Sequence, residues 1–314
     1  MLFACRRPEP PPGKPSLSSP RLDPAAFSGE RALAQTRDLV AFSPRDAGTT
    51  NAGLAARHLA QRLREAGLEV EIDEFQDDSP IGPLTFRNVL GRRPGTGPGV
   101  IVLGSHYDTK AGIGDGFEGA NDSGSSSGVL LEMAAAARRA GPLAVSLLFV
   151  FFDGEECIRD YGRTDGLHGS RRLAGRLAES GAFGNVAAGI VLDMIGDTNL
   201  TVELPRNSSP FLCSAVLEAS REENARDRFR LARGGVLDDH APFLAAGMPA
   251  IDLIDFDYGS APGLNDYWHT PADRMDKLSA SSLQTVGRVA IRTVNRLLDT
   301  QRAPPAAAAA RDAR

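Results

Sequence analysis

The stretch 145-VSLLFVFFDGEE-156 places two adjacent glutamates directly after a nearly continuous apolar run. The length of this run and its aromatic and branched residues predict a strand that is buried on both faces, as in parallel sheets. Two like charges beside a buried strand repel each other and resist desolvation. Glu155 and Glu156 therefore need either open solvent or a partner that compensates their charge.

Strand-like and helix-like segments alternate on both sides of this stretch. Strands are expected at 68–75, 85–93, 100–108, 145–152, 189–197 and 249–257, and helices at 51–66, 127–140, 167–179, 209–223 and 279–299. This alternation predicts an α/β fold, a three-layer αβα sandwich with a mixed, mostly parallel central sheet. In such sheets, ligands bind at the carboxyl ends of the strands.

The composition excludes several classes of protein. The 314 residues are 42% hydrophobic and 24% charged, which is ordinary for a globular chain with a core. The net charge of -5 and the lack of a basic stretch exclude nucleic acid as a partner. No apolar run approaches the roughly 18 residues that a membrane-spanning helix needs.

Both ends of the chain lack periodic patterns. Residues 1–25 are rich in proline and serine, and residues 303–314 are of low complexity, so we expect disorder or a signal remnant around one catalytic domain at 26–302. Residues 2–5 resemble the end of a bacterial lipoprotein signal without its long apolar core. Either the resemblance is accidental and the protein is cytoplasmic, or the true start lies upstream and the protein is secreted, periplasmic or lipid-anchored.

Three predicted strands deliver ionisable side chains to one edge of the sheet. His106 lies near the end of the first strand, Glu155 and Glu156 follow the second, and Asp193 lies in the third. The carboxyl ends of neighbouring parallel strands meet at the same edge. We therefore expect these side chains to lie close together.

Two predicted loops complete a metal-binding pattern. Asp122 lies in a glycine- and serine-rich loop, where a helix cap is the simpler alternative, and His269 alone fits a surface histidine. Zinc binds histidine nitrogen and carboxylate oxygen with a position left open for chemistry. Such a cation would compensate the two glutamates and separate their roles, with Glu156 as a ligand and Glu155 as the general acid/base. The alternative is a solvated loop at the strand end.

Seven motifs, in order, resemble the zinc metallopeptidase family that holds the bacterial and vacuolar aminopeptidases and the animal glutaminyl-peptide cyclotransferases. They are GSHYDT (104–109), GANDSGSSSGVLLEMA (119–134), FFDGEE (151–156), LHGSRRLA (167–174), VLDMIGD (191–197), DDHAPFLAAGMPAIDLI (238–254) and YWHTPAD (267–273). The motifs occur in the family's order, and the resemblance covers about residues 50–300.

The resemblance implies roles for individual residues. The ligands of the zinc common to both branches match Asp122, Glu156 and His269, and the catalytic glutamate matches Glu155. His106 and Asp193 match the residues that hold a second zinc in the aminopeptidases. The resemblance therefore implies one zinc in a cyclotransferase and two in an aminopeptidase.

Three features favour the cyclotransferase branch. Residues 157–166 form an insertion after the glutamates, as in the cyclotransferases. Trp268 precedes the zinc histidine, where the family's indole lines the glutamine pocket; a core or rim aromatic is the alternative. Asp239 matches the aspartate that joins a hydrogen-bond network with the residue at Asp193, and the resemblance implies that these two catalytic residues tune and orient the proton transfer. The extra acids of this chain, expected to favour a cationic amine near the pocket, are Asp252, Asp255, Asp257 and Asp266.

The resemblance thus implies a zinc-dependent monomer that acts on peptide or protein N-termini. The preferred reaction converts N-terminal glutamine to pyroglutamate and releases ammonia. The alternative is an aminopeptidase with the same ligands, in which Glu155 activates water. A metal-free binding module ranks below both, because the candidate ligands and Glu155 are all present.

Overall fold

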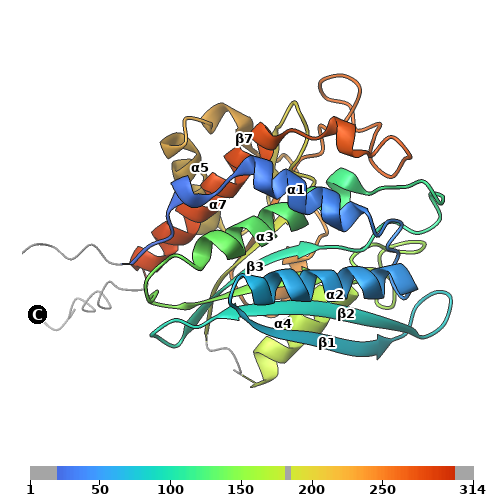
Figure 1. Ribbon diagram of the computed structural model, residues 1–314, viewed down its shortest axis with the longest axis horizontal. Coiled ribbons are helices and arrows are strands. Elements are labelled where there is room, and N and C mark those ends of the chain that lie inside the picture. Colours follow the sequence, from blue (N-terminus) through green and yellow to red (C-terminus); the bar gives the residue numbers. More distant parts are fainter. Residues whose placement is uncertain (1–19, 181–184, 301–314) are drawn as a thin grey trace, which may run out of the picture.

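The computed structural model describes residues 20–180 and 185–300, which form one eight-stranded sheet in the order β1-β2-β4-β3-β5-β8-β6-β7 (Figure 1). The strands are β1 (Glu69–Asp77), β2 (Leu84–Arg93), β3 (Gly99–His106), β4 (Ser146–Phe152), β5 (Asn185–Asp193), β6 (Val202–Leu204), β7 (Phe229–Leu231) and β8 (Ala250–Ile254). The α-helices are α1 (Gly29–Val40), α2 (Thr50–Glu65), α3 (Ser126–Ala137), α4 (His168–Ser180), α5 (Pro210–Glu222), α6 (His240–Ala245) and α7 (Ala280–Thr300).

The centre of the sheet is parallel, and antiparallel pairs join it to both margins, where β6 and β7 are again parallel to each other. Strands β4, β3, β5 and β8 run parallel to one another. Strand β2 pairs antiparallel with both β1 and β4, and β6 pairs antiparallel with β8. The mixed, mostly parallel sheet that the sequence predicted is confirmed.

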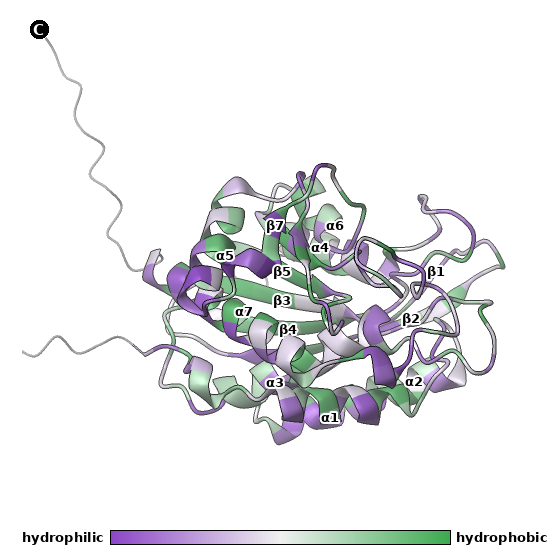
Figure 2. Cartoon of the chain, turned by 90° about the horizontal axis from the view of Figure 1, so that it is seen from above, coloured by the Kyte–Doolittle hydropathy of each residue, from purple (hydrophilic) through white to green (hydrophobic). Residues whose placement is uncertain are grey.

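Strand β4 shows why the sheet needs a helical layer on each face. Leu147, Phe149 and Phe151 contribute to one core, and the alternating residues Leu148 and Val150 contribute to the other. Helices α1, α2, α3, α5 and α7 cover the first face, and α4 and α6 cover the second (Figures 1 and 2). Figure 2 shows the hydrophobic strands enclosed between these layers.

The structure adds elements that the sequence analysis did not predict. Helix α1 begins after Ser28, whose side chain accepts a hydrogen bond from the backbone N–H of Arg31. It packs against α3 and α7 through residues that include Ala32 and Leu39. Strands β6 and β7 span three residues each, which is too short for an alternating pattern to stand out.

Residues 20–25, which lie before the predicted start of the domain at residue 26, pack against the domain in the structure. Leu22 is buried, and its backbone N–H donates to the side chain of Asn295 in α7 over 2.9 Å. The pattern of residues 20–25 has no periodicity, because this segment packs as a loop with a short 3₁₀ turn, Pro24–Ala26. Residues 1–19 and 303–314, on which the other terminal predictions fall, lie outside the described residues.

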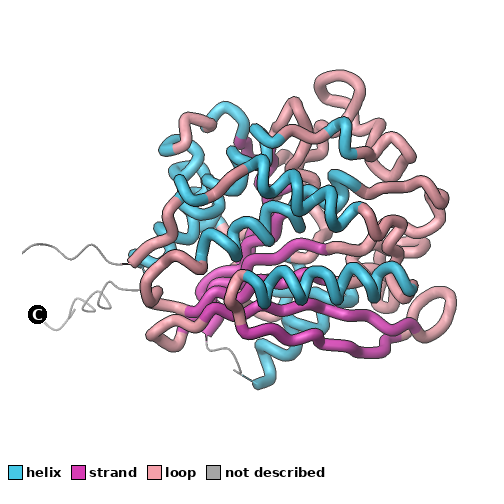
Figure 3. Tube along the Cα trace, viewed as in Figure 1, coloured by secondary structure: helices cyan, strands magenta, loops and turns pink. Residues whose placement is uncertain are grey.

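Loops gather at the end of the molecule toward which β3 runs (Figures 1 and 3). Strands β3, β5 and β8 end at His106, Asp193 and Ile254, a few residues before the predicted ends. Their polar residues therefore lie at the strand ends and in the loops beyond them. Within the described parts of the chain, no helix combines the length and apolar character needed to cross a membrane.

Candidate active site

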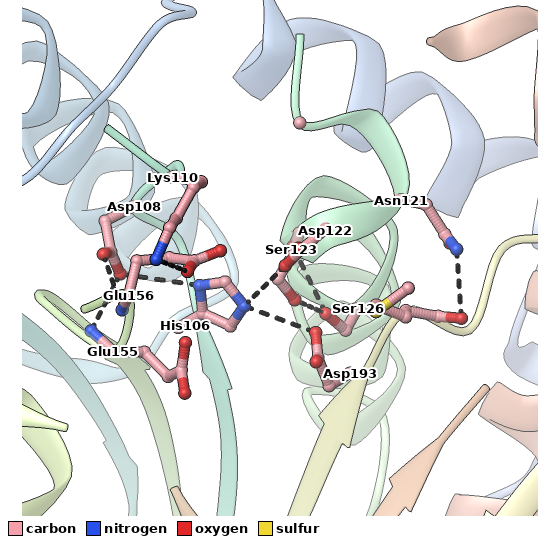
Figure 4. A network of polar contacts seen from close by, with 12 residues as sticks. His106, Asp108, Lys110, Asn121, Asp122, Ser123, Ser126, Glu155, Glu156 and Asp193 are labelled. Atoms are coloured by element: carbon pink, nitrogen blue, oxygen red, sulfur yellow. Dashed lines mark hydrogen bonds and ion pairs between the residues drawn. The ribbon is translucent and has the colours of Figure 1, made fainter. Parts of the chain in front are cut away.

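His106, the last residue of β3, lies at the centre of a buried polar network. Its Nε2 atom is 3.1 Å from Oδ1 of Asp122 and 3.3 Å from Oδ1 of Asp193, while its Nδ1 atom is 3.5 Å from Asp108 (Figure 4). All four side chains are buried. His106 at the end of β3 and Asp193 at the end of β5 therefore lie together, as expected.

Asp122 is held at a fixed place by its backbone. It lies in the π-helical turn Ala120–Ser125 before α3, where the carboxylate of Asp273 accepts the N–H groups of Asn121 and Asp122 over 2.7 and 3.2 Å. Tyr258 donates a further hydrogen bond to Asp273 over 2.7 Å. The N-cap positions of this turn and of α3 are Gly119 and Ser125, so Asp122 is not a helix cap.

The two glutamates lie in the tight turn after β4. Gly154 has φ +71°, and a Cβ atom there would lie 2.5 Å from the ring of Phe86, so the turn requires glycine. The carboxylate of Asp108 accepts the backbone N–H groups of Glu155 and Glu156, each over 3.2 Å. Both glutamate side chains are buried. This burial excludes the alternative in which the pair lies in a solvated loop at the strand end.

The adjacent glutamate side chains point in different directions. Glu156 Oε1 is 2.9 Å from Nε2 of His269, which is itself 3.2 Å from Oδ2 of Asp122. Glu155 turns the other way, and its Oε1 accepts a hydrogen bond from the Tyr161 hydroxyl over 3.0 Å. Glu156 therefore joins Asp122 and His269, and Glu155 stays free of that group.

The candidate ligands form two groups that share Asp122. In each of Asp122–Glu156–His269 and His106–Asp122–Asp193, one donor atom per residue lies within 4.8 Å of the others. Because Asp122 turns Oδ2 toward the first group and Oδ1 toward the second, its carboxylate could bridge two ions. The geometry thus accommodates either one or two metals.

Several buried polar atoms of this site make no hydrogen bond, and a bound cation would satisfy them. Glu156 Oε2 is buried without a hydrogen bond, and the contacts of His106 Nε2 with Asp122 and Asp193 are ion-pair contacts without hydrogen-bond geometry. Uncompensated buried carboxylates are costly, and this combination of carboxylates and imidazoles is a zinc ligand set. The Lys110 ammonium lies 3.7 Å from Glu156 Oε2 and compensates it only in part.

The pKa values of the two glutamates are raised, which also indicates that the site lacks compensating positive charge. Burial, with repulsion from Asp122, raises the pKa of Glu156 to about 7. Burial raises the pKa of Glu155 well above its ordinary value; attraction to His106 opposes this rise, and repulsion from Glu156 adds to it. For Asp122, burial opposes ionisation, but the close contacts with the His106 and His269 rings hold its pKa below the ordinary value.

A cavity of about 140 Å³ opens beside these residues, which is the space of roughly five water molecules. Its base includes the candidate ligands, and its walls are Tyr161, Val236, Leu237, Phe256 and Trp268. The Trp268 indole stacks on the His269 ring with centroids 4.0 Å apart and is 38% exposed. Trp268 is therefore a rim aromatic that borders the cavity.

Of the two adjacent aspartates before α6, Asp238 lines the cavity and Asp239 does not. Asp238 lines the cavity beside Asp193, whereas Asp239 is buried outside the lining. Adjacent residues at the start of α6 point in different directions, and the motif DDH does not indicate which one faces the site. Asp238 also forms a buried group with His240 and Asp252 that the sequence analysis did not single out.

The extra acids do not line the cavity. The carboxylate of Asp255 accepts the N–H groups of Thr201 and Asp257, and Asp266 accepts hydrogen bonds from Ser260. Asp257 forms an ion pair with Arg230 at 3.2 Å. These acids stabilise loops, so the expectation that they attract an amine to the pocket is not supported.

The model of the family described as Peptidase family M28 matches residues 88–294. A glutaminyl-peptide cyclotransferase of Drosophila melanogaster is 30% identical over 283 residues, which cover 82% of this chain and 78% of that protein. The structure of an Acidobacteriales bacterium glutaminyl cyclase has 32% identity and a TM-score of 0.81, with 95% of this chain and 100% of that chain covered. A Zn-dependent exopeptidase of Parabacteroides distasonis has 26% identity and a TM-score of 0.76, with 86% and 98% covered.

Proposed function

Because the chain belongs to peptidase family M28, we propose that it is a zinc-dependent glutaminyl-peptide cyclotransferase. It converts the N-terminal glutamine of peptides to pyroglutamate and releases ammonia. The relatives named as cyclotransferases at 30% and 32% identity support this reaction. The zinc-dependent exopeptidase neighbour supports the same metal chemistry.

One observation carries the proposal: a small cavity places a free carboxylate and an aromatic wall around the candidate ligands. Glu155 is outside the ligand group, and Trp268 stacks on His269 at the rim. A cavity of about 140 Å³ suits one short side chain better than an extended peptide. The substrate's glutamine side chain is therefore proposed to lie against Trp268 with its amide toward the ligands.

Asp122, Glu156 and His269 are the proposed ligands of one zinc, which would polarise the carbonyl of the glutamine side-chain amide as a Lewis acid. Glu155 accepts a proton from the α-amine as its nitrogen bonds to the amide carbon. Glu155 then returns a proton to the amide nitrogen as the carbon–nitrogen bond breaks. The products are the five-membered lactam and ammonia, so atoms and protons balance.

The residues around Glu155 suit this transfer of a proton. Burial raises the pKa of Glu155 above its ordinary value, which makes its carboxylate a stronger base toward the α-amine. Tyr161 donates to one of its oxygens and so orients it. Asp193 and Asp238 line the cavity near Glu155, and we assign them the orienting role that the sequence analysis gave to Asp193 and Asp239.

The second candidate function is an aminopeptidase. The observation that favours it is the complete group of His106, Asp122 and Asp193, which would hold a second zinc. Glu155 would then activate water in place of the substrate amine. Two tightly held zinc ions per chain support the peptidase, and one supports the cyclotransferase.

A paired product assay tests the proposed function. The purified protein is offered glutamine-initiated dipeptides and aminoacyl-nitroanilides, and ammonia and arylamine release are followed separately. We expect ammonia from the free dipeptides, and none from an N-acetylglutaminyl control, whose blocked amine cannot attack. Arylamine release without ammonia would assign the peptidase instead. We also predict that the enzyme acts as a monomer, and the route of export stays a prediction.

A further inference from the structure

A second hollow adjoins the catalytic cavity on the side of helix α6. We name this hollow of about 450 Å³ the α6 groove. Its apolar lining consists of Tyr161, Leu167, Leu237, Ala241, Pro242 and Ala245. None of these residues is among the candidate ligands, so the groove is free to serve a different purpose.

The groove and the catalytic cavity share two lining residues. Tyr161 and Leu237 line both, and these two side chains are 38% and 54% exposed. A peptide whose terminal glutamine occupies the cavity and whose chain crosses Tyr161 and Leu237 therefore enters the α6 groove with its next residue.

The wall of the groove is built before any ligand arrives. The Asp165 carboxylate accepts the backbone N–H groups of Arg159 and Asp160 over 2.9 and 3.1 Å. The guanidinium of Arg171 donates to the carbonyls of Gly162 and Asp165 over 2.7 and 3.3 Å. These bonds hold the loop that carries Tyr161, so little conformational entropy is lost when a ligand binds there.

One charge faces the groove without a partner. Arg163 lines the groove and is exposed, and no ion pair or side-chain hydrogen bond engages its guanidinium within residues 20–180 and 185–300. Arg171 lines it too, but its donors are occupied by backbone carbonyls. The groove therefore combines an apolar floor with one positive charge at its rim.

We propose that the α6 groove is a subsite for the peptide residue that follows the terminal glutamine and that it selects an apolar side chain there. Arg163 adds a preference for an acidic residue at the third position. This inference rests on the proposed function, because it takes the terminal glutamine to occupy the catalytic cavity.

The first measurement compares kcat/KM for ammonia release from Gln-Leu and Gln-Gly. Half-burial of a leucine side chain in an open groove predicts a preference of about five- to tenfold for Gln-Leu. The preference should lie in KM with kcat nearly equal, because the groove contacts a part of the substrate that does not react. Equal kcat/KM values for the two dipeptides would overturn the proposal.

A groove-filling variant supplies the matched comparison. Ala245→Trp places a large side chain at an exposed position of the groove, and Ala246→Trp places the same side chain at the next residue, which is exposed but does not line the groove. We expect Ala245→Trp to reduce the Gln-Leu preference to about onefold while Gln-Gly turnover is unchanged. Ala246→Trp should keep the preference. A preference that survives Ala245→Trp contradicts the assignment.

The rim charge is tested with tripeptide amides. Gln-Leu-Glu-amide should have about two- to threefold higher kcat/KM than Gln-Leu-Lys-amide at low salt, the size of an exposed ion pair, and Arg163→Gln should abolish this difference. A difference that persists in Arg163→Gln refutes the role of Arg163. Failure of the proposed function has another signature, since no glutamine peptide, Gln-Gly included, would then release ammonia.

Discussion

Replacing Tyr161 by phenylalanine removes one hydroxyl group from the wall of the catalytic cavity. That hydroxyl donates to Glu155 Oε1 over 3.0 Å. Burial and the charge of Glu155 raise the pKa of Tyr161 far above its ordinary value, so the phenol keeps the proton that it donates. The phenylalanine ring retains the apolar wall, so the change isolates the hydrogen bond.

The size of the effect follows from the contact and its exposure. A hydrogen bond to a charged group contributes about 1.5–3 kcal/mol, which corresponds to roughly 10- to 150-fold in rate. Because Tyr161 is 38% exposed, water can replace part of the lost donor. We therefore expect the lower end, a fall of about tenfold in kcat for ammonia release, with zinc content unchanged.

The pH profile provides a second readout. A donor to the ionised carboxylate lowers the pKa of that carboxylate, so loss of the Tyr161 hydroxyl raises the pKa of Glu155. The acid limb of the rate profile should then move to higher pH. Tyr267→Phe is the control, because no hydrogen bond engages its hydroxyl among the described residues. A wild-type rate and an unmoved acid limb in Tyr161→Phe would refute the orientation of Glu155 by Tyr161.

Three further predictions concern the rest of the site. Trp268→Ala should lower kcat/KM by about tenfold or more through loss of the aromatic wall and should leave zinc bound; an unaffected rate would remove Trp268 from the pocket. Asp238→Asn should lower ammonia release more than Asp239→Asn, because only Asp238 lines the cavity, and the reverse order would restore the prediction from sequence. Chelation of zinc should abolish ammonia release and lower Tm, and added zinc should restore both; a chelator-resistant rate would contradict the metal assignment.

The parts of the fold that could be predicted are those with long, unambiguous patterns. Strand β4 and helix α7 have continuous apolar or helical periodicity, and both lie within one or two residues of the predicted ends. The three-residue strands β6 and β7 have no room for a pattern. Residues 20–25 fold because Leu22 contacts α7, a long-range contact that local periodicity cannot reveal.

The candidate site shows the same division. His106, Asp122, Glu156, Asp193 and His269 come together as expected, because strand ends and flanking motifs place them at one edge of the sheet. The choice between neighbouring aspartates depends on how each side chain leaves the backbone. Asp238 lines the cavity, whereas Asp239, the residue that the resemblance indicated, lies outside the lining.

Supporting residues were harder to predict from sequence. Asp108 and Asp273 each accept two backbone N–H groups, and Tyr161 donates to Glu155 from within an insertion. All three lie in stretches that the sequence analysis noted, yet their partners are distant or depend on how a loop folds. Residue type and spacing alone do not specify such contacts.

The most direct test of the account is the division of roles between the two glutamates, measured as zinc content and ammonia release in matched amide variants. Glu156→Gln should lower zinc affinity, because a neutral amide is a weaker partner for a dication. Glu155→Gln should retain zinc and the fold and lose about 10²–10⁴-fold in rate, the usual contribution of a positioned acid/base. If Glu155→Gln loses zinc while Glu156→Gln keeps it, or if both variants keep zinc and full activity, the proposed mechanism is wrong.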